Sequence, residues 1–273
     1  MHRLREGRVA IVTGGARGLG HRRALRLLIG LIAWAIATTS VSASNSSNDA
    51  EWTLAPYAWA LNFSGRVGIG GQSVPLDVDA EELVGSIKAG AMGYARRVQG
   101  PHMVYAEGLG FDFEDRSLEQ FNDLPTRAQA LFVELGYGYR FEQASALPNG
   151  GVITLTPYIG LRHASLDIAA DVPFPFADVA ADEHWLDPVL GLLIEGPIRG
   201  RLAYVLKLDG AGFGLGQDHY SSGALYAVYL FEKSWMLGGG YRISRFNADP
   251  GSDNDLTLRL LGRGPALGLG YRW

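Results

Sequence analysis

Three polar residues on one predicted strand have the types and spacing of a hydrolytic site. His163, Ser165 and Asp167 lie at alternate positions of the strand predicted over 151–168, so their side chains share a face. Such a set could supply a base, a nucleophile and an orienting group. Neighbours on one face are about 6.5–7 Å apart along a strand, too far for direct hydrogen bonds unless the strand bends. We therefore treat the three as weak catalytic candidates and interpret them as polar residues near a strand end.

A second pattern, near the N-terminus, is typical of nucleotide binding. An apolar run leads into Thr13-Gly14-x-x-x-Gly18-x-Gly20, where glycines would let the backbone approach a pyrophosphate. Residues 8–20 resemble the start of short-chain dehydrogenases/reductases, and Tyr229 and Lys233 match that family's Tyr-x-x-x-Lys spacing. The family's serine position is Gly216, and alternating βα units are missing. We interpret the resemblance as a chance match that does not reflect the fold. An NAD(P)-dependent reductase stays as the least favoured alternative. We expect no cofactor and no metal site.

The first 43 residues have the organisation of an export signal. Arginines precede the apolar run Leu27–Ala37, and Val41-Ser42-Ala43 offers a cleavage site. We predict a signal peptide over 1–43 and a single mature domain over 44–273. Seven of the 24 basic residues and one of the 28 acidic residues lie in this leader, which leaves the mature chain with a net charge of −10. That balance argues against nucleic acid as a partner.

The mature chain is predicted to form an all-β, closed antiparallel barrel of ten strands, with eight as the alternative. Short turns alternate with long acidic connections, at 66–85, 114–126, 169–183, 214–218 and 248–254, as expected for a barrel with short turns at one end and longer loops at the other. No later stretch approaches the roughly 20 apolar residues of a spanning helix. The predicted strands are 52–65, 86–97, 102–113, 127–141, 151–168, 184–196, 201–213, 219–231, 235–247 and 255–273.

Side chains within these strands alternate between an apolar set and a small or polar set. In 127–141, Leu131, Val133 and Leu135 oppose Glu134 and Arg140. This period of two suits a barrel with lipid outside and a lumen inside, although a soluble lipocalin-like barrel with the opposite orientation has the same period. The charges predicted to face the lumen are Glu134, Arg140, Arg162, Asp187, Glu195, Lys207, Asp209 and Arg242. They are expected to fill the lumen or, less favoured, to line a narrow ion path.

The C-terminal strand decides between the two orientations. Leu267, Leu269, Tyr271 and Trp273 alternate with small or polar residues, and the chain stops on the tryptophan. This ending resembles the C-terminal signature of Gram-negative outer-membrane barrels. The resemblance implies that the barrel-insertion machinery is a partner and that the cell outer membrane is the location.

A wider resemblance covers most of the mature chain. Its motifs are similar to a family of proteobacterial outer-membrane barrels of unassigned activity, small barrels of the OmpA and OmpW type. The resemblance implies a small outer-membrane barrel and carries no catalytic residues across. We expect a monomeric structural or surface-interaction protein in contact with outer-membrane lipid and lipopolysaccharide, with weak small-solute permeation as an added property, and no enzyme. His163-x-Ser165 also resembles a pair in outer-membrane lipid A deacylases, which implies a lipid A-type acyl hydrolase as the alternative. The motifs are Pro56-Tyr57-Ala58-Trp59-Ala60, Val78-Asp79-Ala80-Glu81-Glu82-Leu83, Trp185-Leu186-Asp187-Pro188-Val189-Leu190-Gly191 and Gly210-Ala211-Gly212-Phe213-Gly214.

Overall fold

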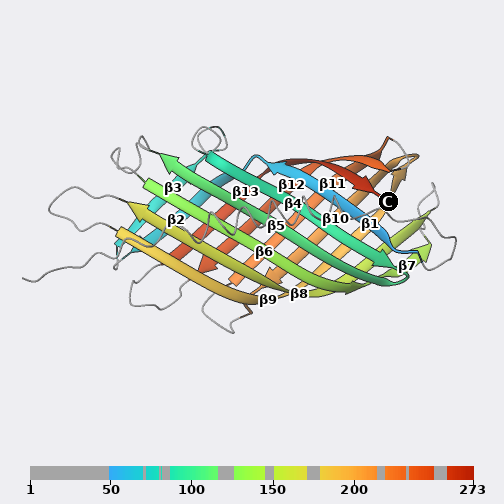
Figure 1. Ribbon diagram of the computed structural model, residues 1–273, viewed down its shortest axis with the longest axis horizontal. Helices are drawn as coiled ribbons and strands as arrows, with labels where there is room; N and C mark the ends of the chain where they lie inside the picture. Colours follow the sequence, from blue (N-terminus) through green and yellow to red (C-terminus); the bar gives the residue numbers. More distant parts are fainter. Residues whose placement is uncertain are drawn as a thin grey trace, which may run out of the picture. The chain divides into compact units, whose positions relative to one another are not determined.

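The computed structural model places the described residues in one closed antiparallel sheet, with strands that run obliquely around the barrel (Figure 1). Within these residues, no helix is long and apolar enough to span a membrane. The predicted signal peptide, residues 1–43, lies outside them and stays a prediction. The described residues are 49–69, 72–79, 81, 87–115, 126–144, 151–170, 179–213, 219–231, 234–248 and 257–273.

Thirteen strand segments make up the sheet: β1 (Glu51–Trp59), β2 (Asn62–Ile69), β3 (Gln72–Val78), β4 (Ile87–Gln99), β5 (His102–Asp115), β6 (Thr126–Tyr139), β7 (Phe141–Ala144), β8 (Val152–Ala170), β9 (Val179–Arg199), β10 (Leu202–Ala211), β11 (His219–Leu230), β12 (Trp235–Ala248) and β13 (Thr257–Arg272).

These segments combine into ten barrel strands, which confirms the predicted fold. β1 and β2 pair with β13 in one register, and β6 and β7 pair with β8 in one register, so each pair is a single interrupted strand. β3 pairs with β2 and β4 pairs with β1, so both lie on the same side of that interrupted strand, although their registers, Phe63 opposite Val78 and Glu51 opposite Val98, differ by eight residues. The barrel closes where β1 meets β13, with Thr53 opposite Arg272 and Trp59 opposite Ala266.

Two predicted loops were too long. The connection predicted over 169–183 is shorter, because β8 continues to Ala170 and β9 begins at Val179. Residues 66–85 were expected to be irregular, but β2 continues to Ile69 and β3 pairs with it over Gln72–Val78. The composition of β3 hides it, because Pro75 and Asp77 are residue types depleted in strands. Pro75 is tolerated because β3 is hydrogen-bonded only to β2 among the described strands, and a proline without an N–H suits such an edge.

The orientation of the side chains follows the prediction of lipid outside and charge inside. Leu135, Ile159 and Leu186 leave 59%, 60% and 63% of their surface exposed on the outer wall, whereas Glu134 and Arg162 are buried. Exposed leucine and isoleucine on every second residue of adjacent strands form an apolar belt that water would not stabilise and lipid would. The lipocalin-like orientation is therefore excluded.

One end of the barrel carries the two-residue turns and the C-terminus. Gly100 and Gly200, both with a φ of +57°, open the β4–β5 and β9–β10 turns, where a left-handed backbone favours glycine. At the same end, Trp52 and Trp273 exchange backbone hydrogen bonds, and their rings stack at 6.4 Å. Short turns mark the periplasmic end of an outer-membrane barrel.

Small residues on the lumen wall make room for large side chains. Gly240 on β12 lies beneath Tyr226 of β11, and a Cβ at Gly240 would come within 2.1 Å of the Leu225 carbonyl oxygen. Toward the extracellular end, Trp59, Leu61 and Leu109 are buried together. The extracellular part of the interior is thus filled by side chains from both walls, as expected for a barrel of this size.

Candidate functional site

The centre of the lumen holds a buried ion cluster contributed by neighbouring strands. Arg162 on β8 donates from Nε to Glu134 Oε2 on β6 at 2.9 Å, with a second, shorter contact from Nη2. The same Nη2 donates to Asp209 Oδ1 on β10 at 3.1 Å, and the guanidinium lies 3.7 Å from the centroid of the Tyr220 ring. The side chains of Arg162, Glu134 and Asp209 are only 7%, 5% and 0% exposed, so each charge depends on the others for its stability.

A second group of contacts extends this cluster across the lumen. Lys207 Nζ on β10 lies 2.5 Å from Glu107 Oε2 on β5, and Arg242 Nη1 on β12 lies 2.7 Å from Glu107 Oε1. Glu107 also accepts a hydrogen bond from the Tyr57 hydroxyl at 2.8 Å. β5 is separated from both β10 and β12 by at least three strands in either direction around the barrel, so these contacts join opposite walls.

Lys207 connects the two groups, since its Nζ also lies 3.5 Å from Glu134 Oε1 and 3.8 Å from Asp209 Oδ2. The connected set contains three carboxylates and three cations, so its charges balance. We call it the lumen network, and its members are Glu107, Glu134, Arg162, Lys207, Asp209 and Arg242.

Tyrosine hydroxyls donate hydrogen bonds to the carboxylates of the lumen network. Tyr105 donates to Glu134 Oε1 at 2.7 Å, and Tyr158 is placed to donate to Asp209 Oδ2 at 3.4 Å. The rings of Tyr105 and Tyr158 meet edge to face with their centroids 5.1 Å apart. The tyrosines therefore fix the carboxylates in place and fill space beside them.

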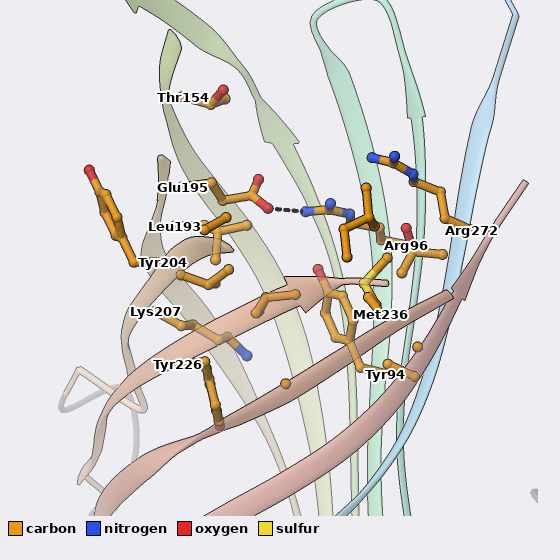
Figure 2. Close-up of a pocket in the computed structure, with 18 of the residues that line it drawn as sticks. Tyr94, Arg96, Thr154, Leu193, Glu195, Tyr204, Lys207, Tyr226, Met236 and Arg272 are labelled. Atoms are coloured by element: carbon orange, nitrogen blue, oxygen red, sulfur yellow. Dashed lines mark hydrogen bonds and ion pairs between the residues drawn. The ribbon is translucent and has the colours of Figure 1, made fainter. Parts of the chain in front are cut away.

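A cavity of about 900 Å³ lies between the lumen network and the periplasmic turns, and we call it the chamber. Its lining runs from Glu107 and Lys207 at the inner end to Gly100 and Gly200 at the turns. Figure 2 shows Arg96 and Glu195 pointing toward each other across it, and their ion pair is 2.7 Å long. Apolar and aromatic side chains complete the wall, among them Tyr94, Leu193, Tyr204, Tyr226 and Met236.

The structure places the eight predicted lumen charges in three locations. Glu134, Arg162, Lys207, Asp209 and Arg242 belong to the lumen network. Glu195 and Arg140 line the chamber, where Arg140 also approaches Glu142 at 3.5 Å. Asp187 is half-buried on β9, directly opposite Arg162 in the β8–β9 register.

Sequence reasoning missed Glu107 and Arg96. Both face the lumen, but their neighbours on the same face are apolar: Met103, Tyr105 and Leu109 beside Glu107 are all buried. Alternation therefore did not mark the face as polar. The remaining signal was a single charge at an inward position of an otherwise apolar face, as in Tyr105-x-Glu107.

The three catalytic candidates lie on the outer wall of β8. His163 is exposed, and its ring stacks on that of His184 with centroids 6.2 Å apart and an interplanar angle of 10°. Ser165 is only 2% exposed, and Asp167 is half-buried. A nucleophile needs access to its substrate, and the burial of Ser165 restricts that access. Among the described residues, no group of three His, Cys, Asp or Glu could hold a metal ion.

The reductase pattern finds no structural support in the described part of the chain. Tyr229 is exposed on the outer wall near the periplasmic end of β11, while Lys233 and residues 8–20 lie outside the described residues. The elements formed by the described residues are all strands, so they contain no βαβ unit for a dinucleotide.

The C-terminal residues of the proposed insertion signature face outward on β13. Leu267, Leu269 and Tyr271 are exposed, and Trp273 stacks on Tyr271 with centroids 5.7 Å apart. Trp235 meets Tyr271 at 4.8 Å. Together with Trp52 they form an aromatic girdle at the periplasmic end of the apolar belt, as interfacial aromatic residues do.

No protein-family model and no curated protein sequence matches this chain. Solved structures do resemble it at low identity. The outer membrane protease OmpT from Escherichia coli is 13% identical with a TM-score of 0.45, over 85% of this chain and 99% of that chain. Neisserial surface protein A is 12% identical with a TM-score of 0.32, over 82% and 97%.

A major outer membrane protein from Thermus thermophilus is 13% identical with a TM-score of 0.39, over 82% of this chain and 100% of that chain. The assignment of this chain rests on its own architecture. The sheet is closed, its outer wall is apolar and ends in an aromatic girdle, and its interior is charged. These are the properties that a lipid bilayer demands of a spanning sheet, and the chain is an integral β-barrel protein of the outer membrane.

Proposed function

We propose that this protein serves a structural or surface-interaction role in the outer membrane as a closed barrel, and that it is not an open pore. The observation that carries the proposal is the lumen network, whose ion pairs join opposite walls. A solute crossing the barrel would have to separate Lys207 from Glu107, whose side chains are each 14% exposed. Separating a buried pair leaves uncompensated charges, at a cost of about 3–5 kcal/mol for each pair broken.

The extracellular side of the lumen network adds a second obstruction. Trp59, Leu61 and Leu109 are buried there, with Phe111 and Phe132 packed against them. An apolar constriction excludes water and hydrated ions. The chamber therefore ends at the lumen network, and permeation of small solutes is limited to rare rearrangements of both obstructions.

Single-channel conductance in planar bilayers tests this proposal. We expect the wild-type barrel to show no steady open level. The double variant Glu107→Ala/Lys207→Ala removes both contacts between opposite walls, Lys207–Glu107 and Arg242–Glu107, without changing the net charge. Because the apolar constriction remains, we expect this variant to show brief openings that the wild type lacks, and not a steady porin-like level. The matched control is Arg96→Ala/Glu195→Ala, which also removes an ion pair across the lumen but leaves the lumen network intact, and we expect it to stay closed. A porin-like open level in the wild type, or equal conductance of the two variants, would contradict the proposal.

We also infer that the barrel has no catalytic activity. The burial of Ser165 and the stacking of His163 on His184 support this inference, because a lipid hydrolase on the outer wall would need the serine hydroxyl exposed beside its base. We further propose that the protein is monomeric, since closure of the sheet between β1 and β13 leaves the wall complete without a second chain.

A further inference from the structure

Four arginines form a group on the outer wall in its extracellular half. Arg66 on β2 and Arg259 on β13 are direct partners across the strands. Arg263 lies four residues along β13 from Arg259 and therefore on the same face, and Arg245 on β12 pairs with Leu261, between those two positions. All four side chains are exposed. We call this group the arginine patch.

The arginine patch lacks acidic partners within the described part of the chain. None of the four arginines makes an ion pair or a hydrogen bond there with its guanidinium. Asp77 on the adjacent β3 is nearby in the register, opposite Ser64, but one carboxylate does not balance four cations. Like charges placed directly opposite each other across two strands, as in Arg66 and Arg259, destabilise the sheet. A bound anion would reverse that effect.

The position of the arginine patch along the barrel axis indicates which kind of anion it could contact. Arg263 and Arg259 lie eight and twelve residues above Tyr271 of the periplasmic girdle. With a rise of about 3.4 Å per residue and a tilt of about 40°, these positions are about 21 Å and about 31 Å above that girdle. The apolar band of an outer-membrane barrel is about 25 Å tall. The arginine patch therefore spans the outer boundary of the hydrocarbon region, where lipid headgroups meet the wall.

Guanidinium groups suit phosphate in particular, because their planar donors can contact two phosphate oxygens at once. The four arginines lie on neighbouring segments of the wall, β2, β13 and β12. On β8 and β9, outward positions in the extracellular half carry His163, Asp167 and His184 in place of arginine. We propose that the arginine patch binds the phosphate groups of an anionic glycolipid of the outer leaflet, an inference that rests on the outer-membrane placement above and not on the lumen being closed.

Native mass spectrometry of the detergent-solubilised mature protein tests this proposal. The probes are bis-phosphorylated lipid A and the same lipid A after enzymatic dephosphorylation. The test variant is Arg259→Gln/Arg263→Gln. The control is Arg97→Gln/Arg199→Gln, which makes the same change in charge at the periplasmic end, where Arg199 is exposed and Arg97 lies over the Trp52 ring.

We expect the wild type and the control to retain the phosphorylated lipid in preference to the dephosphorylated one. A surface cation contributes about a fivefold gain in affinity for an anionic lipid surface. The test variant removes two cations and should therefore lose affinity about 25-fold. Equal retention of the two lipids by the wild type would overturn the proposal. Undiminished lipid binding by the test variant, shown to be folded by its heat-modifiable migration on a gel, would also overturn it. Neither result bears on conductance, so failure here is distinguishable from failure of the closed-barrel proposal.

Discussion

Replacing Arg162 by glutamine should destabilise the barrel more than any other single change to its charges. Arg162 holds both Glu134 and Asp209 through its guanidinium and covers the Tyr220 ring. Without it, these two carboxylates retain Lys207 as their nearest cation, at 3.5 and 3.8 Å, and Lys207 is already shared with Glu107.

The expected magnitude follows from the burial of these groups. Removing one partner of a buried ion pair costs about 3–5 kcal/mol, and we count the lost cation–π contact, worth about 2 kcal/mol when desolvated, as part of that total. We expect Arg162→Gln to lower the free energy of unfolding by about 4 kcal/mol. The double variant Glu134→Gln/Arg162→Gln removes one charge of each sign and should cost less than the sum of the two single variants, with a coupling energy of about 2 kcal/mol.

Urea titration of the mature protein refolded into lipid vesicles measures these values. The signal is the fluorescence of the five tryptophans in residues 44–273, and the values are extrapolated linearly to water. Arg199→Gln serves as the control, because Arg199 is exposed at a periplasmic turn, and it should change stability by less than about 0.5 kcal/mol. The reasoning is refuted if Arg162→Gln costs less than about 1 kcal/mol, or if the double variant costs as much as both single variants together.

Two further predictions concern the packing of Gly240 and the role of Ser165. Gly240→Ala should lower the free energy of unfolding by about 2 kcal/mol, because the new Cβ would lie 2.1 Å from the Leu225 carbonyl oxygen. The control is Gly239→Ala, whose nearest contact is at 3.7 Å and which should be nearly neutral in the same titration; similar losses for the two variants would contradict the packing argument. Ser165→Ala should leave the acylation of lipid A in expressing cells identical to that with the wild type, and a difference between the two, read by mass spectrometry of extracted lipid A, would revive the hydrolase.

The ten strands and the direction of their faces could be predicted because the bilayer imposes a simple rule. Every second residue of a spanning strand faces lipid and must be apolar. The alternation of Leu131, Val133 and Leu135 with Glu134 therefore indicates the fold directly. The same rule does not cover β3, which is paired with β2 alone among the described strands. In β3, Pro75 and Asp77 are residue types typical of loops, so the sequence predicted a loop there.

The partners inside the lumen could not be predicted. Alternation tells which face a charge occupies, but the contact between Lys207 and Glu107 depends on the stagger and curvature of strands that are 100 residues apart in the chain. That stagger is a property of the closed barrel. Glu107 was hidden for a further reason, since its apolar neighbours made its face resemble a lipid-facing one.

The lumen network and the arginine patch differ in charge balance, and this difference indicates a structural role for the first and a binding role for the second. The lumen network is balanced, with three carboxylates and three cations in mutual contact, and therefore needs no ligand to be stable. The arginine patch is unbalanced within the described residues, with Arg66 directly opposite Arg259 on the outer wall. A balanced buried set stabilises the closed state, whereas an unbalanced exposed set is stabilised by an anion from outside. The outer wall, and not the lumen, is therefore where this protein should meet its partners.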